Sequence, residues 1–123
     1  MANPSDTGPS GVGTEVIRRS YVSPVGTSEA TVLAGVANHI LTIISIIIQN
    51  GTGNSTDNTF QLYIDRDLSG TNVPLIDQSC NNKATFIWND RFALTETDKL
   101  HIIGYGTSVE YHAWCTYIDQ EFA

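Results

Sequence analysis

The stretch His39–Asn50 constrains the fold of this 123-residue chain more than any other. Six of its residues are isoleucine, and Thr42 adds another β-branched side chain. The χ1 angles of such side chains are restricted, which favours a pleated strand over a helix. Successive residues of a strand point to opposite faces, and both faces are mainly apolar here. We therefore expect a strand that is covered on both sides.

The two faces of this strand are predicted to have different partners. One face is expected to pack inside the domain and consists of Ile40, Ile44, Ile46 and Ile48. Its partners are expected to be Phe60, Leu62 and Phe86. The other face is too apolar for water and predicts an oligomer interface, made of Leu41, Ile43 and Ile47 with Trp114 and Ile118 of the last strand. The pattern leaves the reverse assignment of the faces open.

The rest of the chain alternates short β-type segments with turn sequences. These segments predict strands at residues 15–22, 28–34, 58–65, 73–77, 83–89, 92–94, 100–105 and 109–118. Pro74 places its strand at a sheet edge, because proline has no backbone N–H. No window repeats apolar residues with helical spacing, so almost no helix is expected. The pattern predicts an all-β chain, with a single β-sandwich of the jelly-roll kind over residues 14–123 and eight or nine short strands.

Two segments carry more detailed predictions. Residues 51–57 are turn formers throughout, so the strands on either side of them are expected to pair as a hairpin. In the last strand, Trp114 and Ile118 lie on one face. The other face is formed by Val109, Tyr111, Ala113, Cys115 and Tyr117.

Residues 1–13 are expected to form an extended N-terminal arm. Val12 interrupts a run of glycine, proline and small polar residues that cannot pack on itself. The arm is either a frayed terminus or a strap that becomes ordered on a neighbouring molecule. As a strap, it would bind through Pro4, Pro9 and Val12, together with the basic pair Arg18 and Arg19 that follows.

Charge and hydropathy exclude several partners. The net charge is −7, and the six basic residues are scattered apart from Arg18–Arg19, so a nucleic-acid partner is not expected. The isoleucine-rich stretch is shorter than the ~20 residues that cross a bilayer as a helix, so no membrane partner is expected. The start of the chain lacks the basic and apolar regions of a signal peptide, which predicts a soluble intracellular product.

The sequence predicts no catalytic centre, metal site or cofactor. Cys80 and Cys115 lack metal-ligand spacing and are interpreted as buried thiols, with a disulfide left open. Cys115 lies within an apolar strand, and no G-x-S-x-G motif is present. His101 and His112 could approach each other on neighbouring strands, with Glu110 or Asp98 as a carboxylate ligand for a metal, but their spacing is not that of a metal site.

Two further patterns admit a binding role as the alternative to a structural one. Residues 65–70 match the first half of a calcium loop, but its twelfth position is Ile76 instead of glutamate, which favours a polar turn. Aromatic side chains in strands favour a core or subunit interface, with a carbohydrate platform as the alternative. The candidates for that platform are Tyr63, Tyr105, Tyr111, Trp114 and Tyr117.

A longer pattern runs from Val32 to the C-terminus. Its parts are the segments 46–52, 60–65, 84–90, 92–100 and 109–118, which read IIIQNGT, FQLYID, ATFIWND, FALTETDKL and VEYHAWCTYI. This pattern resembles the small β-sandwich virion proteins of tailed bacteriophages, namely the capsid decoration or cement class and related tail-adaptor and fibre-head modules. The chain departs from it at Thr95-Glu-Thr97, where the family often has Pro-Ala-Gly.

The resemblance implies a non-enzymatic structural protein without cofactors. It implies a homotrimer on the capsid surface of a virion, made in the host cytoplasm and fastened to the major capsid protein by its N-terminal arm. The alternative is a tail-fibre or tail-tip head module that binds a host receptor or glycan.

Overall fold

The computed structural model describes residues 15–51, 58–66, 72–81, 83–106 and 108–122. These residues form nine strands and contain no α-helix. The strands are β1 (Glu15–Val25), β2 (Ala30–Ala34), β3 (His39–Asn50), β4 (Asn58–Asp65), β5 (Asn72–Cys80), β6 (Thr85–Trp88), β7 (Phe92–Leu94), β8 (Lys99–Tyr105) and β9 (Tyr111–Glu121). The predicted arm, residues 1–13, and most of the 65–70 turn lie outside the described residues.

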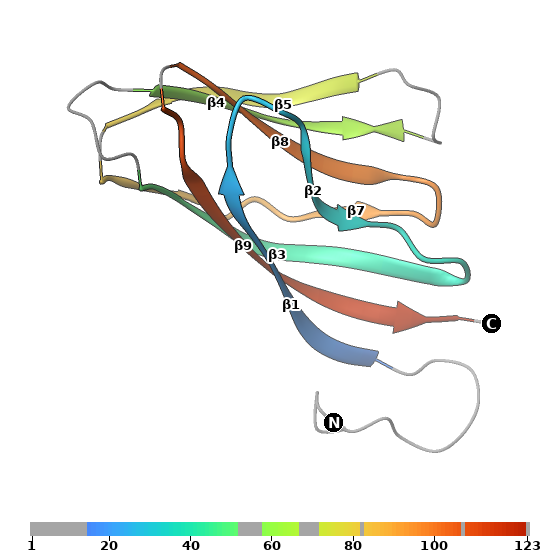
Figure 1. The fold of residues 1–123 in the computed structure, drawn as a ribbon. Helices are drawn as coiled ribbons and strands as arrows, with labels where there is room; N and C mark the ends of the chain where they lie inside the picture. Colours follow the sequence, from blue (N-terminus) through green and yellow to red (C-terminus); the bar gives the residue numbers. More distant parts are fainter. Residues whose placement is uncertain (1–14, 52–57, 67–71, 82, 107, 123) are drawn as a thin grey trace.

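The strands form two antiparallel sheets that face each other (Figure 1). The first sheet has the order β1-β9-β3-β6, with β7 also paired to β3. The second sheet has the order β2-β8-β4-β5. The chain passes from one sheet to the other after β1, β2, β3, β5, β7 and β8, which is the double-sheet arrangement of a jelly roll. The predicted fold is confirmed, including the edge position of the Pro74 strand, β5.

The predicted hairpin between β3 and β4 is wrong. β3 pairs with β6, β7 and β9 in the first sheet, whereas β4 pairs with β5 and β8 in the second. Phe60 and Leu62 of β4 are fully buried between the sheets, opposite the inner side of β3. A run of turn residues predicts a reversal of the chain, but it does not decide whether the returning strand lies beside the first or across the core.

The inward face of β3 differs from the predicted one. Leu41 and Ile43 are 1% and 0% exposed and belong to the core, whereas Ile40 is 38% exposed. A bulge between Ile43 and Ser45 shifts the alternation, so that Ile46 and Ile48 also point inward. Leu41 and Ile43 are therefore wrong as oligomer-interface residues, because both of their side chains are already covered within one chain.

The core is completed by aromatic contacts between the sheets. The ring of Phe60 meets the edges of Phe86 and Tyr111, with centroids 5.4 Å and 5.5 Å apart. The predicted inward face of the last strand is confirmed, with Tyr111, Ala113 and Cys115 all 0% exposed. Cys80 and Cys115 are both buried free thiols.

The buried thiol of Cys115 predicts a loss of stability at high pH. Burial raises its pKa from 9.0 to about 12, so above pH 9 the unfolded chain loses a proton that the folded chain keeps. This group therefore stabilises the fold fully below pH 9 and progressively less as the pH rises to 12. Between pH 9 and 12, we expect Cys115 to lower the free energy of unfolding by about 1.4 kcal/mol per pH unit.

Denaturant titrations of the wild type and Cys115→Ala between pH 9 and 12 measure this slope. The free energy of unfolding is expected to fall more steeply with pH in the wild type. Burial also raises the pKa values of Tyr63 and Tyr111, but both proteins contain these tyrosines, so their effect cancels in the comparison. Parallel slopes would contradict the prediction.

Candidate interaction surface

The outer face of the first sheet, which points away from the core, carries an exposed apolar row across four strands. The strand register places Tyr21 opposite Trp114, Trp114 opposite Ile47, and Ile47 opposite Ile87. Tyr21, Ile47 and Ile87 are 51%, 39% and 55% exposed, and Trp114 is half-buried. We call these four residues the cross-strand row. It places apolar side chains in water along the width of the sheet.

Trp114 is held between two side chains of β1. The ring centroids of Tyr21 and Trp114 are 4.0 Å apart, and the guanidinium carbon of Arg19 lies 4.9 Å from the Trp114 centroid. A cation over a tryptophan ring contributes about 0.5–1 kcal/mol at an exposed site. These contacts fix the orientation of Trp114 within the row.

A second apolar cluster lies on the same face, toward the C-terminal end of β9. Ile118 stands between Ile17 on β1 and Thr42 on β3 in the register. Ile17 is 47% exposed, and Ile40 is exposed beside this cluster. Three of the five predicted interface residues, namely Ile47, Trp114 and Ile118, therefore share this outer face.

The outer face is poor in charge, although the whole chain carries 13 acidic residues. Between the row of Ile118 and the row of Trp114, the outward positions of the described strands include one charged residue, Arg19. Arg18 and Arg19 lie within β1, as the predicted strand at residues 15–22 implies. Sequence reasoning missed Tyr21 as part of this face, because its role depends on cross-strand register.

A polar network borders the cross-strand row. The Ser23 hydroxyl contacts His112 Nδ1, and the Tyr21 hydroxyl lies 3.5 Å from the same nitrogen. Glu110 lies 3.5 Å from His112 Nε2, on the other side of the ring. A Cβ on Gly51 would lie 2.6 Å from the His112 ring, so only glycine allows this packing. The network joins β1 to β9 at the margin of the outer face.

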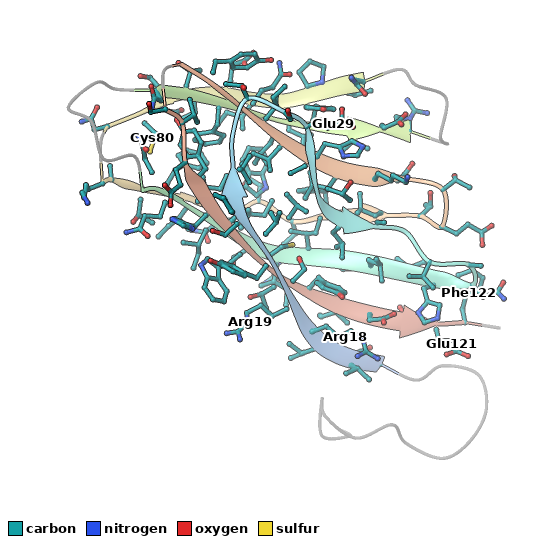
Figure 2. All side chains as sticks on the ribbon, viewed as in Figure 1. Arg18, Arg19, Glu29, Cys80, Glu121 and Phe122 are labelled. Atoms are coloured by element: carbon teal, nitrogen blue, oxygen red, sulfur yellow. The ribbon has the colours of Figure 1, made fainter. Side chains whose placement is uncertain are left out.

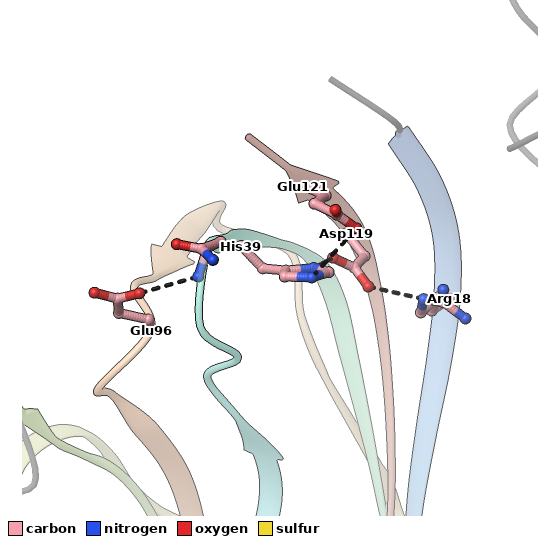
Figure 3. Close-up of polar contacts among 6 residues, drawn as sticks. Arg18, His39, Glu96, Asp119 and Glu121 are labelled. Carbon is pink, nitrogen blue, oxygen red and sulfur yellow. Dashed lines mark hydrogen bonds and ion pairs between the residues drawn. The ribbon is translucent and has the colours of Figure 1, made fainter. Parts of the chain in front are cut away.

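An ionic cluster joins the other ends of β1, β3 and β9 (Figure 3). Arg18 Nε donates a hydrogen bond of 2.8 Å to Asp119 Oδ2, and His39 Nδ1 pairs with the other oxygen of Asp119. Glu121 lies 3.7 Å from His39 Nε2. Asp119 is 9% exposed, and Arg18 and His39 contact the two oxygens of its carboxylate. Arg18 is therefore anchored to the sandwich through Asp119, and its role in capsid binding stays a prediction.

A third polar cluster lies on the outer side of the second sheet. Tyr63 donates a hydrogen bond to Glu29, and His101 contacts both Glu29 at 3.7 Å and Thr31 at 3.2 Å. Burial and the hydrogen bond to Glu29 raise the pKa of Tyr63, so its hydroxyl stays protonated as a donor. Glu29 thereby fastens the connection between β1 and β2 to strands β4 and β8.

His101 and His112, the pair weighed for a metal site and not favoured, lie in different sheets. The five aromatic residues weighed as an alternative carbohydrate platform do not share one exposed surface either. Tyr63 and Tyr111 are 3% and 0% exposed, and Trp114 lies on the opposite side of the sandwich from Tyr63. Within the described ranges, no group of three or more His, Cys, Asp or Glu side chains is arranged to hold a metal ion.

None of the described residues belongs to a helix of the length and apolar character that crosses a bilayer. No protein-family model matches the sequence, and no curated protein matches it. The resemblance to phage decoration proteins therefore stays a prediction.

Solved structures do share the fold. A protein of Bacillus endospore appendages, which form disulfide-linked pili, is 16% identical over 92% of this chain and 93% of its own, with a TM-score of 0.54. PirA is 10% identical over 80% of this chain and 92% of its own, with a TM-score of 0.52. A chain of the cyanophage Pam1 capsid is 14% identical over 98% of this chain and 94% of its own, with a TM-score of 0.42. The first two support the fold assignment and nothing beyond it.

Proposed function

We propose that the protein is a non-enzymatic structural subunit of a phage particle. In this proposal it is a homotrimeric decoration protein that binds and stabilises the major capsid protein. The proposal is based on the exposed apolar side chains on the outer face of the first sheet. Its exposed apolar side chains, led by Tyr21, Ile47 and Ile87, are what a subunit interface buries.

Burial of this face gives self-association a driving force. Covering a large apolar side chain contributes about 1.5–3 kcal/mol relative to leaving it exposed. The half-buried or exposed residues Ile47, Trp114 and Ile118 are proposed as the contacts with the neighbouring subunit. Trp114 is the proposed anchor, because tryptophan dominates the binding energy of many interfaces.

The mode of self-association in this proposal differs from that of the Bacillus neighbour. The Bacillus neighbour forms pili that are linked by disulfides. Disulfide linkage does not extend to Cys80 and Cys115, since both thiols are buried in the sandwich. In our proposal this chain assembles through the apolar outer face of its first sheet instead.

The N-terminal arm, residues 1–13, is proposed to bind the capsid. Extended, a chain of this length reaches up to ~45 Å, far enough to cross onto a neighbouring capsid subunit. Pro4, Pro9 and Val12 are its proposed contact residues. We expect a variant that lacks residues 1–13 to fold and to form the same oligomer, but to lose binding to capsids.

Co-sedimentation with capsids that lack the protein measures this binding, and light scattering measures the oligomer. The Ser5→Ala, Ser10→Ala double variant keeps the length of the arm and its proposed contact residues, and it is the matched control, expected to bind capsids fully. Full binding by the truncated protein would contradict the role of the arm.

Cryo-electron microscopy of particles from the producing cells would locate the protein on the capsid, and its absence from every particle would refute the virion proposal.

A second candidate function is a glycan-binding or receptor-binding head module of a tail fibre. The exposed ring of Tyr21 favours it, since sugars stack on exposed aromatic faces. A glycan array tests this candidate. Binding that disappears in Tyr21→Ala would support it, and an array without hits would remove it.

A further inference from the structure

A second exposed apolar patch lies where the chain ends. Val36 and Phe122 are 45% and 46% exposed. The backbone N–H of Phe122 donates a hydrogen bond of 3.0 Å to the carbonyl of Asn38, so the C-terminal residues lie against the turn before β3. Figure 2 labels Phe122 and Glu121 side by side at this end of the molecule.

This second patch is acidic. The Glu96 carboxylate accepts a hydrogen bond of 3.0 Å from the backbone N–H of Asn38 and is exposed to solvent (Figure 3). The side chain of Glu121 is 45% exposed. Arg18 pairs with Asp119, and His39 contacts both Asp119 and Glu121. We call Val36, Glu96, Glu121 and Phe122 the end patch; it combines two apolar side chains with two exposed carboxylates.

The outer face of the first sheet has the complementary character. It is apolar, and its central charge is the guanidinium of Arg19. Within the described part of the chain, Arg19 forms no salt bridge, in contrast to Arg18. A carboxylate from outside the molecule would complete the charge pairing of Arg19, while apolar side chains beside it would cover the cross-strand row.

We propose that the outer face of the first sheet binds the end patch of a second copy of this chain. This inference rests on the self-association proposed above and names the surface that the partner contributes. Arg19 and Phe122 lie far apart in Figure 2, so Arg19 does not reach the end patch of its own molecule. A contact between two different surfaces is heterologous, and such contacts close into rings when the rotation between subunits allows it. A rotation of about 120° between neighbouring subunits would close such a ring as a trimer.

Charge reversal tests the pairing of these two surfaces. Arg19→Glu and Glu96→Arg are each expected to raise the dissociation constant of the oligomer about tenfold or more, because each places like charges across the interface. The double variant restores opposite charges and is expected to return the constant to within about threefold of the wild type. Sedimentation velocity over a dilution series measures all four proteins, and thermal melts confirm that each is folded.

Asp77→Arg is the matched control, because it reverses an exposed acid on the second sheet, where the partner of Asp77 is Gln61. We expect it to leave the dissociation constant unchanged. If Arg19→Glu does not fold, Arg19→Gln is used in its place, because it removes the positive charge without adding a carboxylate. If the wild type is oligomeric but the dissociation constant of the double variant is no lower than that of the less disruptive single variant, this pairing alone is overturned. A monomeric wild type would overturn both the pairing and the proposed self-association.

Discussion

Truncation of Ile46 to alanine is expected to lower the free energy of unfolding by about 2–5 kcal/mol, whereas the same change at Ile47 is expected to cost less than about 1 kcal/mol. The two residues are neighbours in β3 but point to opposite faces. Ile46 is 0% exposed, so its truncation leaves a cavity between the sheets. Ile47 is 39% exposed, so its truncation removes side-chain atoms that water already reaches.

Urea titrations of the two variants at low protein concentration measure this difference. The low concentration matters, because self-association would add stability to the wild type by mass action. Ile48→Ala is the control for burial, since Ile48 is also 0% exposed and should behave like Ile46. Equal losses at Ile46 and Ile47 would show that the outer face is covered within a single chain, which contradicts the account given above.

Introduction of a carboxylate into the cross-strand row is expected to abolish self-association. Ile47→Glu would place an unpaired charge in the proposed subunit interface, and the desolvation of such a charge costs several kcal/mol. We expect the dissociation constant of the oligomer to rise by about 100-fold or more, equivalent to about 2.7 kcal/mol. Trp114→Ala is expected to have an effect of similar size, because it removes the proposed anchor of the interface.

Ile103→Glu is the matched control for this experiment. Ile103 lies on β8 opposite Gln61, at an outward position of the second sheet, so the substitution is chemically the same. We expect it to leave the oligomer intact, as measured by size-exclusion chromatography with light scattering. Dissociation by Ile103→Glu and not by Ile47→Glu would place the interface on the other sheet.

The local pattern of the sequence was enough to predict where the strands lie. β3, β4 and β7 have the bounds expected from apolar runs and turn residues, and β9 has the expected inward face. These features depend on side-chain chemistry within a few residues. The jelly-roll assignment followed from the number and spacing of the strands, and the strand order confirms it.

Features that depend on the neighbouring strands could not be predicted in this way. The bulge between Ile43 and Ser45 decides which isoleucines of β3 point inward, and alternation alone assigned Leu41 to the wrong face. The cross-strand row depends on a register between strands that are distant in the sequence, which is why Tyr21 was missed.

The ionic cluster is a similar case. Arg18 and His39 lie 101 and 80 positions before Asp119, and no local motif connects the three residues. Their meeting depends on the central position of β9 between β1 and β3. The same topology separates His101 from His112, although the strands that carry them are consecutive in the sequence.

The central claim is that the apolar outer face of the first sheet joins copies of this chain into a trimer. The mass of the wild-type protein in solution, measured by light scattering at micromolar concentration, tests it most directly. The account predicts three times the chain mass of 13.4 kDa. A single peak at 13.4 kDa, unchanged as the concentration rises, would contradict it.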